Sequence, residues 1–118
     1  MTLRDIFVRV KNALVVSDDL RRKEYRGNPN LYAGHCYVAS EAIFHLAKEV
    51  GISLKPMFVS HQGGPHWYLE GSEGIIDPTK EQFSKTVDYS RGRGKGFLTK
   101  QPSKRAKELI RRSQIPQN

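Results

Sequence analysis

A cysteine, a histidine and an aspartate occupy the positions in this sequence that a thiol-dependent enzyme would require. Cys36 opens a helical pattern, His66 opens an apolar strand pattern, and Asp77 closes the next strand pattern. A thiolate at a helix N-terminus is stabilised by free backbone N–H groups and by the positive end of the helix dipole. An imidazole can accept the thiol proton while a carboxylate holds its other ring nitrogen. The pattern predicts a nucleophile, a base and an orienting acid.

Each of these residues also has a structural interpretation. A lone cysteine is often a small core residue, and its position alone favours neither role for Cys36. His66 shifts the balance because it follows a Gly-Gly-Pro turn, where an imidazole can face a cleft. Antiparallel pairing of the two strands would bring His66 and Asp77 to the same end of a sheet. The catalytic interpretation therefore depends on how these elements pack.

Hydrophobic periodicity predicts the elements that must position the three residues. Apolar side chains recur at helical spacing from Cys36 to Val50, and Gly51 ends this central helix. Short alternating apolar stretches indicate an antiparallel meander of three strands. The fold class is α+β, with helices packed on a small antiparallel sheet and followed by a basic loop and a C-terminal helix. The other expected elements are helices over 2–15 and 18–25, strands over 54–60, 66–70 and 74–77, and a last helix carrying Ala106, Leu109 and Ile110.

Three short motifs resemble the papain-like superfamily of cysteine enzymes, in particular small transglutaminase-like enzymes and bacteriocin-processing cysteine peptidases. They are Gly-His-Cys-Tyr at 34–37, His-Trp-Tyr-Leu-Glu at 66–70 and Ile-Ile-Asp-Pro-Thr at 75–79. The resemblance covers about residues 30–80. It implies that Cys36 is the nucleophile, His66 the general base and acid, and Asp77 the orienting residue, with the cysteine helix packed on the sheet.

The resemblance also implies an oxyanion hole built from the cysteine N–H and an upstream polar side chain. No glutamine precedes Cys36 closely, so Asn28, Asn30 or Tyr32 are the substitutes. His35 is a candidate for tuning the site, although a side chain beside the nucleophile usually points elsewhere. Trp67 is expected either to pack on the helix or to wall a substrate groove.

Metal and cofactor chemistry are not expected. The single cysteine excludes an internal disulfide and a multi-cysteine zinc or iron–sulfur site. His61 could join His66 and either Cys36 or Asp77 around a metal ion, but the spacing matches no standard zinc pattern. We therefore predict no metal and no cofactor.

The net charge of +8 is concentrated near the C-terminus. Residues 1–90 hold equal numbers of basic and acidic side chains, whereas residues 91–112 hold nine basic side chains and one acidic one. Arg91, Arg93 and Lys95 alternate with glycines, a pattern that predicts little regular structure. Such a segment could contact nucleic acid or an acidic partner, or bring its backbone to an anionic substrate, or simply be solvated.

The 118 residues fit one minimal papain-like domain, with a neutral core over 1–90 and a basic part over 91–118. No apolar run approaches a membrane span, and no signal pattern is visible, so we expect a cytoplasmic protein without membrane contact. A compact body with a basic tail is similar to small bacteriophage proteins, which would place it in the host cytoplasm. The expected function is a thiol-dependent hydrolase or acyltransferase acting on an amide, isopeptide or thioester bond of a protein, peptide or small amide. The alternative is a non-catalytic module that binds nucleic acid or an acidic protein through residues 91–112.

Overall fold

The computed structural model describes residues 1–30, 32–62 and 64–114 and has an α+β fold. This confirms the fold class expected from the sequence. The antiparallel sheet has the strand order β3-β2-β1-β4. Its strands are β1 (Lys55–His61), β2 (Gly64–Gly71), β3 (Gly74–Ile76) and β4 (Arg93–Gly94), and the helices are α1 (Leu3–Leu14), α2 (Cys36–Glu49) and α3 (Lys104–Ser113).

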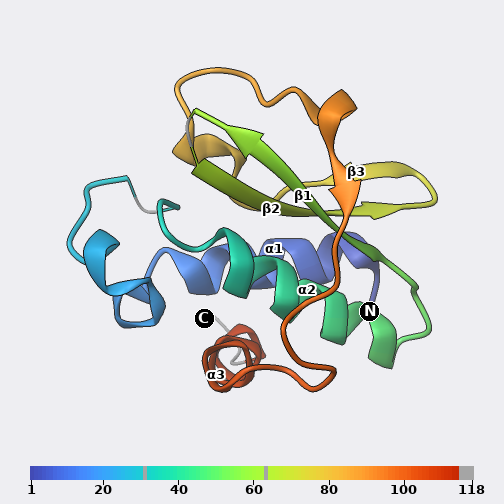
Figure 1. Cartoon of the computed structure of the whole chain (residues 1–118). Coiled ribbons are helices and arrows are strands. Elements are labelled where there is room, and N and C mark those ends of the chain that lie inside the picture. Colours follow the sequence, from blue (N-terminus) through green and yellow to red (C-terminus); the bar gives the residue numbers. More distant parts are fainter. Residues whose placement is uncertain (31, 63, 115–118) are drawn as a thin grey trace.

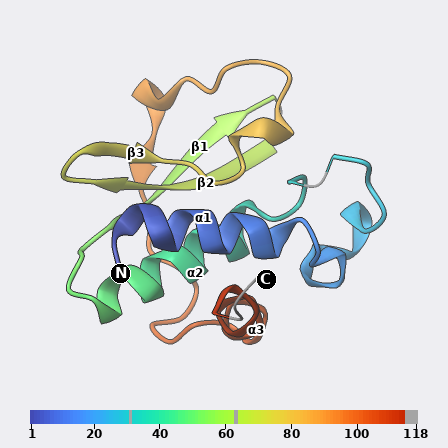
Figure 2. The same cartoon turned by 180° about the vertical axis from the view of Figure 1, so that it is seen from behind.

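The helices lie together on one side of the sheet, and α2 takes the central position (Figure 1). Seen from behind, α1 runs alongside α2, while α3 lies below both (Figure 2). Side chains from all three helices join Leu54 and Leu69 in one buried apolar cluster. On the other side, the chain after β3 covers the sheet, where Val87 packs with Met57, Val59 and Tyr68. The sheet is therefore covered on both sides.

The start and end of α2 follow from local sequence. Gly34 has a φ of +79°, and this left-handed conformation turns the chain into the helix at Cys36. Gly51 has a φ of +82° and follows the last helical turn, as helix C-termini commonly require. Between these glycines the apolar positions Ala39, Ala42 and Ile43 are buried completely. The helix is thus fixed along its length, which holds Cys36 at its first turn.

Strand register explains why His66 and Asp77 approach each other. In β2, His66 and Tyr68 alternate with Trp67 and Leu69, so the first two share one face. The β2–β3 pairing places Ile76 opposite Leu69, and continuing this register puts Asp77 opposite Tyr68. Asp77 is then diagonal to His66 on the same face, within reach of long side chains.

Two local expectations are wrong. Residues 18–25 do not form one helix but two single 3₁₀ turns, Asp18–Leu20 and Lys23–Tyr25. The Gly/basic stretch is not irregular throughout, because Tyr89–Arg91 form a 3₁₀ turn and Arg93–Gly94 form β4 beside β1. The backbone N–H of Lys95 continues this pairing by donating to the carbonyl of Pro56 (3.1 Å). Backbone pairing to β1 compensates for the weak strand propensity of glycine.

Helix α3 is docked on the body of the protein. Ala106 and Leu109 are buried in the same cluster as α1 and α2. Arg112 donates two hydrogen bonds to the Asp19 carboxylate (2.8 and 2.7 Å). The carboxylate of Glu41, fully buried on α2, accepts hydrogen bonds from the backbone N–H and hydroxyl of Ser103 (2.6 and 2.7 Å). Within the described ranges, none of these helices has the length and apolar character needed to cross a membrane.

Candidate active site

His66 and Asp77 form a buried, directly bonded pair. His66 Nε2 lies 2.6 Å from Asp77 Oδ2, and the two residues are 0% and 5% exposed. The other carboxylate oxygen, Oδ1, accepts the backbone N–H of Thr79 at 3.2 Å. The Tyr89 hydroxyl donates to Oδ2 at 2.7 Å. Asp77 is thus held by three donors, and it fixes one nitrogen of the His66 ring.

The second ring nitrogen of His66, Nδ1, is not bonded to Asp77. It is buried and makes no hydrogen bond of ordinary geometry in the described part of the chain. Burial by itself lowers the pKa of His66, but hydrogen bonding to Asp77 and then to the Cys36 thiol raises it to about 9. After Asp77, Cys36 is thus the second group that raises this pKa. A protonated imidazole is therefore favoured at neutral pH.

Cys36 reaches solvent through a cleft of about 610 Å³. It is partly exposed, whereas His66 is fully buried. The first turn of α2 has no side-chain cap at His35, so its leading N–H groups lack the usual capping acceptor. Four aromatic side chains, Tyr25, Tyr37, Trp67 and Phe83, contribute to the cleft walls. A substrate carbonyl could thus approach the Cys36 thiol along an apolar path.

Two contacts fix the segment that leads into Cys36. The side chain of Tyr25 packs so closely on Gly34 that a Cβ there would lie 2.6 Å from the Tyr25 ring. Arg21 is 2% exposed, and its guanidinium donates to the carbonyls of Tyr25, Asn28 and Asn30 (2.8, 2.9 and 2.7 Å). One side chain thus binds three carbonyls of residues 25–30, a stretch that precedes Cys36 in the chain.

Asn30 and Tyr32, two of the residues expected at the oxyanion hole, lie outside the cleft that exposes Cys36. Asn30 donates through Nδ2 to the carbonyls of Glu81 and Gln82 (3.3 and 3.2 Å), so this amide is already engaged. The Tyr32 ring lies under the ammonium of Lys11, at 5.2 Å, on the α1 side of the molecule. Neither residue lines the cleft of Cys36. Asn30 instead fastens the loop before Cys36 to the segment after β3.

His35 is also placed away from the cleft. It is 0% exposed, and neither ring nitrogen has a partner among residues 1–30, 32–62 and 64–114. Burial first, and then the charges of Arg21 and Arg105, lower the pKa of His35 to about 4. A neutral ring is therefore favoured at neutral pH. His35 is thus a buried residue at the start of α2 that makes no hydrogen bond to His66 or Asp77.

Trp67 lines the cleft and belongs to an aromatic cluster. Its ring stacks on Phe97 and meets the edge of Tyr37, with centroid distances of 5.7 and 4.9 Å. Both interpretations of this residue therefore apply, since it packs beside α2 and walls the cleft. The Lys95 ammonium lies over the rings of Phe58 and Trp67, at 4.8 and 5.8 Å. Arg91 and Arg93 are exposed.

The structure does not bring His61 together with His66 around a metal ion. His61 Nε2 lies 3.2 Å from the Lys85 carbonyl, and its ring meets the edge of Phe83. No group of three or more metal-ligating side chains occurs in the part of the chain that the structure describes.

Sequence reasoning missed three residues of the site. Thr79 could have been found, because an aspartate commonly accepts the N–H two residues later. Tyr89 carries no such local signal, since only tertiary packing brings it to Asp77. Gln82 lines the cleft, and its side-chain N–H donates to the Thr79 hydroxyl at 3.0 Å. Gln82 thus contributes a side-chain amide to the cleft that exposes Cys36, from a position downstream of it in the chain.

Comparisons with protein-family models, with curated proteins and with solved structures give no match to this chain. The function must therefore be argued from the site itself.

Proposed function

We propose that the protein is a thiol-dependent hydrolase or acyltransferase that acts on amide, isopeptide or thioester bonds through Cys36, His66 and Asp77. The observation that carries this proposal is the buried His66–Asp77 pair, 2.6 Å apart, whose imidazole is also influenced by the thiol of Cys36. The motif resemblance to papain-like cysteine enzymes supports the same assignment of roles.

In the proposed acylation step, the thiolate of Cys36 attacks the substrate carbonyl carbon and forms a C–S bond. The tetrahedral intermediate collapses when the bond to the leaving amine or thiol breaks. His66, protonated at neutral pH because its pKa is about 9, gives its Nδ1 proton to the leaving group. Asp77 keeps the ring oriented by accepting the Nε2–H bond throughout.

The oxyanion of the intermediate would lie against the start of α2. The Cys36 N–H is one donor, because the first N–H groups of a helix have no intrahelical partner and point along the positive end of its dipole. Gln82 is the candidate for the second donor, since its amide carries a further N–H beyond the one used by Thr79. Neutral His66 then activates water or an acceptor amine, which releases the acyl group and regenerates the thiol.

The proposal is tested with an activated ester, p-nitrophenyl acetate, and with iodoacetamide. Because Cys36 is the only cysteine, whole-protein mass reports its modification directly. We expect a burst of p-nitrophenol equal to the enzyme concentration, an acetylated mass on Cys36, and continuing turnover. Cys36→Ala should abolish all three while keeping the thermal unfolding midpoint.

The outcome that contradicts the proposal is equally defined. If Cys36 reacts with iodoacetamide no faster than glutathione at pH 7, the thiol is not activated. If it is acylated but His66→Gln leaves both the burst rate and the turnover unchanged, the histidine is not the acid and base. Circular dichroism of the folded variant separates a chemical loss from unfolding.

A second candidate function is a binding module that uses the basic C-terminal part. The favouring observation is that Arg91, Arg93 and Lys100 are exposed and form no ion pair within the described ranges. Charge reversal at Arg91 and Arg93 should then remove retention of single-stranded DNA or RNA on a filter, with a steep salt dependence. Retention that is absent in the parent protein, or unchanged in the double variant, contradicts this function.

A further inference from the structure

Basic side chains contribute to the lining of the cleft that exposes Cys36. Arg22, Lys104 and Arg105 line the cleft, and no aspartate or glutamate among the described residues does so. Arg22 is partly compensated by a surface ion pair with Glu24 (2.9 Å). Lys104 and Arg105 form no ion pair in the described part of the chain. The cleft therefore combines apolar aromatic walls with uncompensated positive charge.

The position of Lys104 and Arg105 is unfavourable for the helix that carries them. They are the first two residues of α3, where the helix dipole is positive, and this first turn contains no acidic residue. The Glu41 carboxylate bonds to Ser103 and caps the helix, but no ion pair among the described residues joins it to either cation. Side chains that oppose local stability and face a cleft are expected where they serve binding.

Free backbone donors add to this positive end. Ser103 accepts the N–H of Ala106 with its hydroxyl and the N–H of Lys107 with its carbonyl. The N–H groups of Lys104 and Arg105 have no such acceptor among the contacts of the described residues, as is usual for the first turn of a helix. The two cations that line the cleft thus belong to a helix turn that also carries two N–H groups without an acceptor.

We propose that the cleft selects substrates that carry a carboxylate near the acyl group attacked by Cys36, with Lys104 and Arg105 as the carboxylate-binding residues. This inference rests on the proposed function and specifies its substrate class as an acidic peptide or acidic acyl donor. The aromatic side chains of the cleft hold the apolar part of the substrate, and Lys104 and Arg105 attract the carboxylate. The attraction would raise the local concentration of anionic substrates over neutral ones of equal size.

The test uses two alkylating probes that differ only in charge, iodoacetate and iodoacetamide. Each forms a C–S bond with Cys36 and releases iodide, and whole-protein mass measures both rates. The readout is the iodoacetate-to-iodoacetamide rate ratio, divided by the same ratio for glutathione. We expect about a tenfold preference for the anionic probe at low salt, and a smaller one at 0.5 M salt because of screening.

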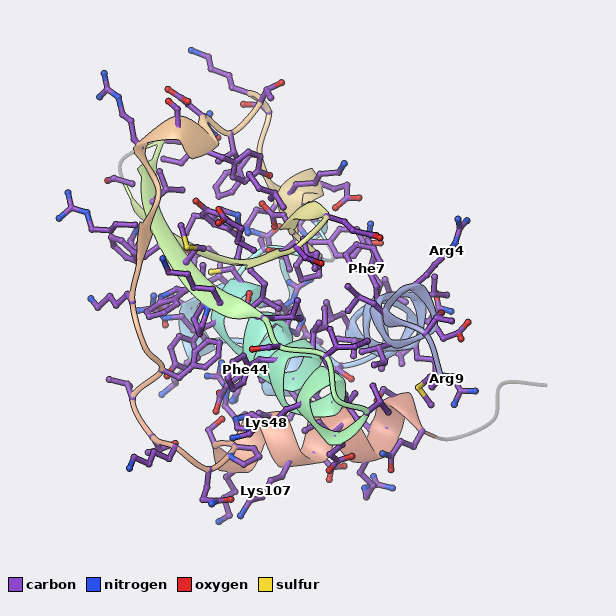
Figure 3. All side chains as sticks on the ribbon, turned by 90° about the vertical axis from the view of Figure 1, so that its right-hand side faces the viewer. Arg4, Phe7, Arg9, Phe44, Lys48 and Lys107 are labelled. Carbon is purple, nitrogen blue, oxygen red and sulfur yellow. The ribbon has the colours of Figure 1, made fainter. Side chains whose placement is uncertain are left out.

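The variant Lys104→Ala/Arg105→Ala should bring the ratio back to that of glutathione. Lys107→Ala is the matched control, because Lys107 is an exposed cation of the same helix that does not line the cleft. Figure 3 shows Lys107 on the outer surface of the molecule, below α2. Lys107→Ala should keep the preference of the parent protein. Thermal unfolding verifies that each variant is folded.

The results separate the two proposals. Rapid iodoacetamide labelling of Cys36 with a glutathione-like ratio overturns the carboxylate preference and leaves the thiol chemistry standing. An equal loss of preference in Lys107→Ala also overturns it, because general surface charge would then be the cause. Labelling of Cys36 that is no faster than that of glutathione with either probe overturns the proposed function, and the substrate class with it.

Discussion

Two histidines in this protein are buried to the same extent, but their pKa values are shifted in opposite directions. His66 and His35 are both 0% exposed. The pKa of His66 is raised to about 9 despite burial, because Asp77 and Cys36 adjoin its ring. The pKa of His35 is lowered to about 4 by burial and by the nearby charges of Arg21 and Arg105. Burial alone therefore does not decide whether a histidine carries charge; its bonded partners do.

The two rings also differ in how their polar atoms are satisfied. His66 is bonded to Asp77, which is itself held by Thr79 and Tyr89. His35 lacks partners at both nitrogens among the described residues, although the neutral ring has one donor and one acceptor. A buried polar group without a hydrogen-bond partner lowers the free energy of unfolding, whereas a hydrogen-bonded buried pair can keep an imidazole protonated. The comparison therefore distinguishes a candidate catalytic histidine from a packing one.

The largest expected effect comes from breaking the bonded pair. Asp77→Asn keeps the side-chain shape but removes the charge that raises the His66 pKa, so His66 should become neutral near pH 7, as His35 is. We expect the acylation rate to fall about a thousandfold, because the ring loses both its proton and its orientation. NMR titration of the histidine rings measures the pKa, and p-nitrophenol release measures the rate.

Glu70→Gln is the matched control, since Glu70 is an exposed carboxylate of the same strand as His66. It should leave the His66 titration near pH 9 and the acylation rate close to those of the parent. A His66 ring that still titrates near pH 9 in Asp77→Asn would show that the carboxylate is not what keeps it charged.

The glycine that precedes both His35 and Cys36 gives the next largest effect. Gly34→Ala adds a methyl group that meets Tyr25 at 2.6 Å, at a residue with a φ of +79°. Gly51→Ala has a similar φ of +82° with no atom within 4 Å of the new methyl group. We expect the first variant to lose about 3 kcal/mol in the free energy of unfolding and the second about 1 kcal/mol.

Urea unfolding measures both variants, and only Gly34→Ala should also slow the alkylation of Cys36. Equal losses in the two variants would mean that the Tyr25 contact relaxes easily. The placement of His35 in the core and of Cys36 in the cleft would then not depend on that close approach.

The pH dependence of stability should show the two histidines separately. The folded-state pKa of His66 is above its ordinary value of 6.5, so its contribution is complete below pH 6.5 and is lost as pH rises through about 9. The folded-state pKa of His35 is below 6.5, so the unfolded chain binds its proton first, and stability falls as pH drops from 6.5 through about 4.

Each limb should amount to about 3 kcal/mol in the free energy of unfolding, measured by urea titrations from pH 4 to 10. His35→Leu should flatten the acid limb alone, and His66→Gln the alkaline limb alone. An acid limb that persists in His35→Leu would assign it to other groups.

The smallest effect should come from the outermost partner of the pair. Tyr89→Phe removes the hydroxyl that donates to Asp77 Oδ2 at 2.7 Å. We expect a loss of about 1 kcal/mol in stability and a several-fold slower acylation, with His66 still charged at pH 7. Tyr68→Phe is the control, because the Tyr68 hydroxyl is buried without a hydrogen-bond partner in the described ranges. A larger loss in Tyr68→Phe than in Tyr89→Phe would contradict this order.

The sequence predicted the parts of this site that depend on periodicity. Helical spacing after Cys36 and the stop at Gly51 define α2, and the twofold repeat of a strand is enough to bring His66 to Asp77. The same reasoning could not find Tyr89 or Gln82, because their contacts depend on how residues 77–92 fold back over the sheet. The strand at Arg93–Gly94 was also not predictable from local sequence, because it forms by pairing with Met57 and Phe58 of β1.

The oxyanion candidates show the same limit. Asn30 is a candidate oxyanion donor because it is close to Cys36 in sequence. In the structure its amide donates to the carbonyls of Glu81 and Gln82, which lie far along the chain. The basic charge of residues 91–112 was likewise countable from the sequence. The different surroundings of these charges could be known only from the fold. Arg112 is bound to Asp19, Lys95 lies over aromatic rings, and Lys104 and Arg105 line the cleft.

The buried carboxylate of Glu41 determines how this chain can be shortened. Its hydrogen-bond partner is Ser103, so a chain ending near residue 90 would leave Glu41 without that partner and expose the surface that Ala106 and Leu109 cover. Such a fragment would lose fold stability together with charge. The basic residues must therefore be studied by substitution in the full-length chain, because deletion would confuse their role in binding with their role in the core.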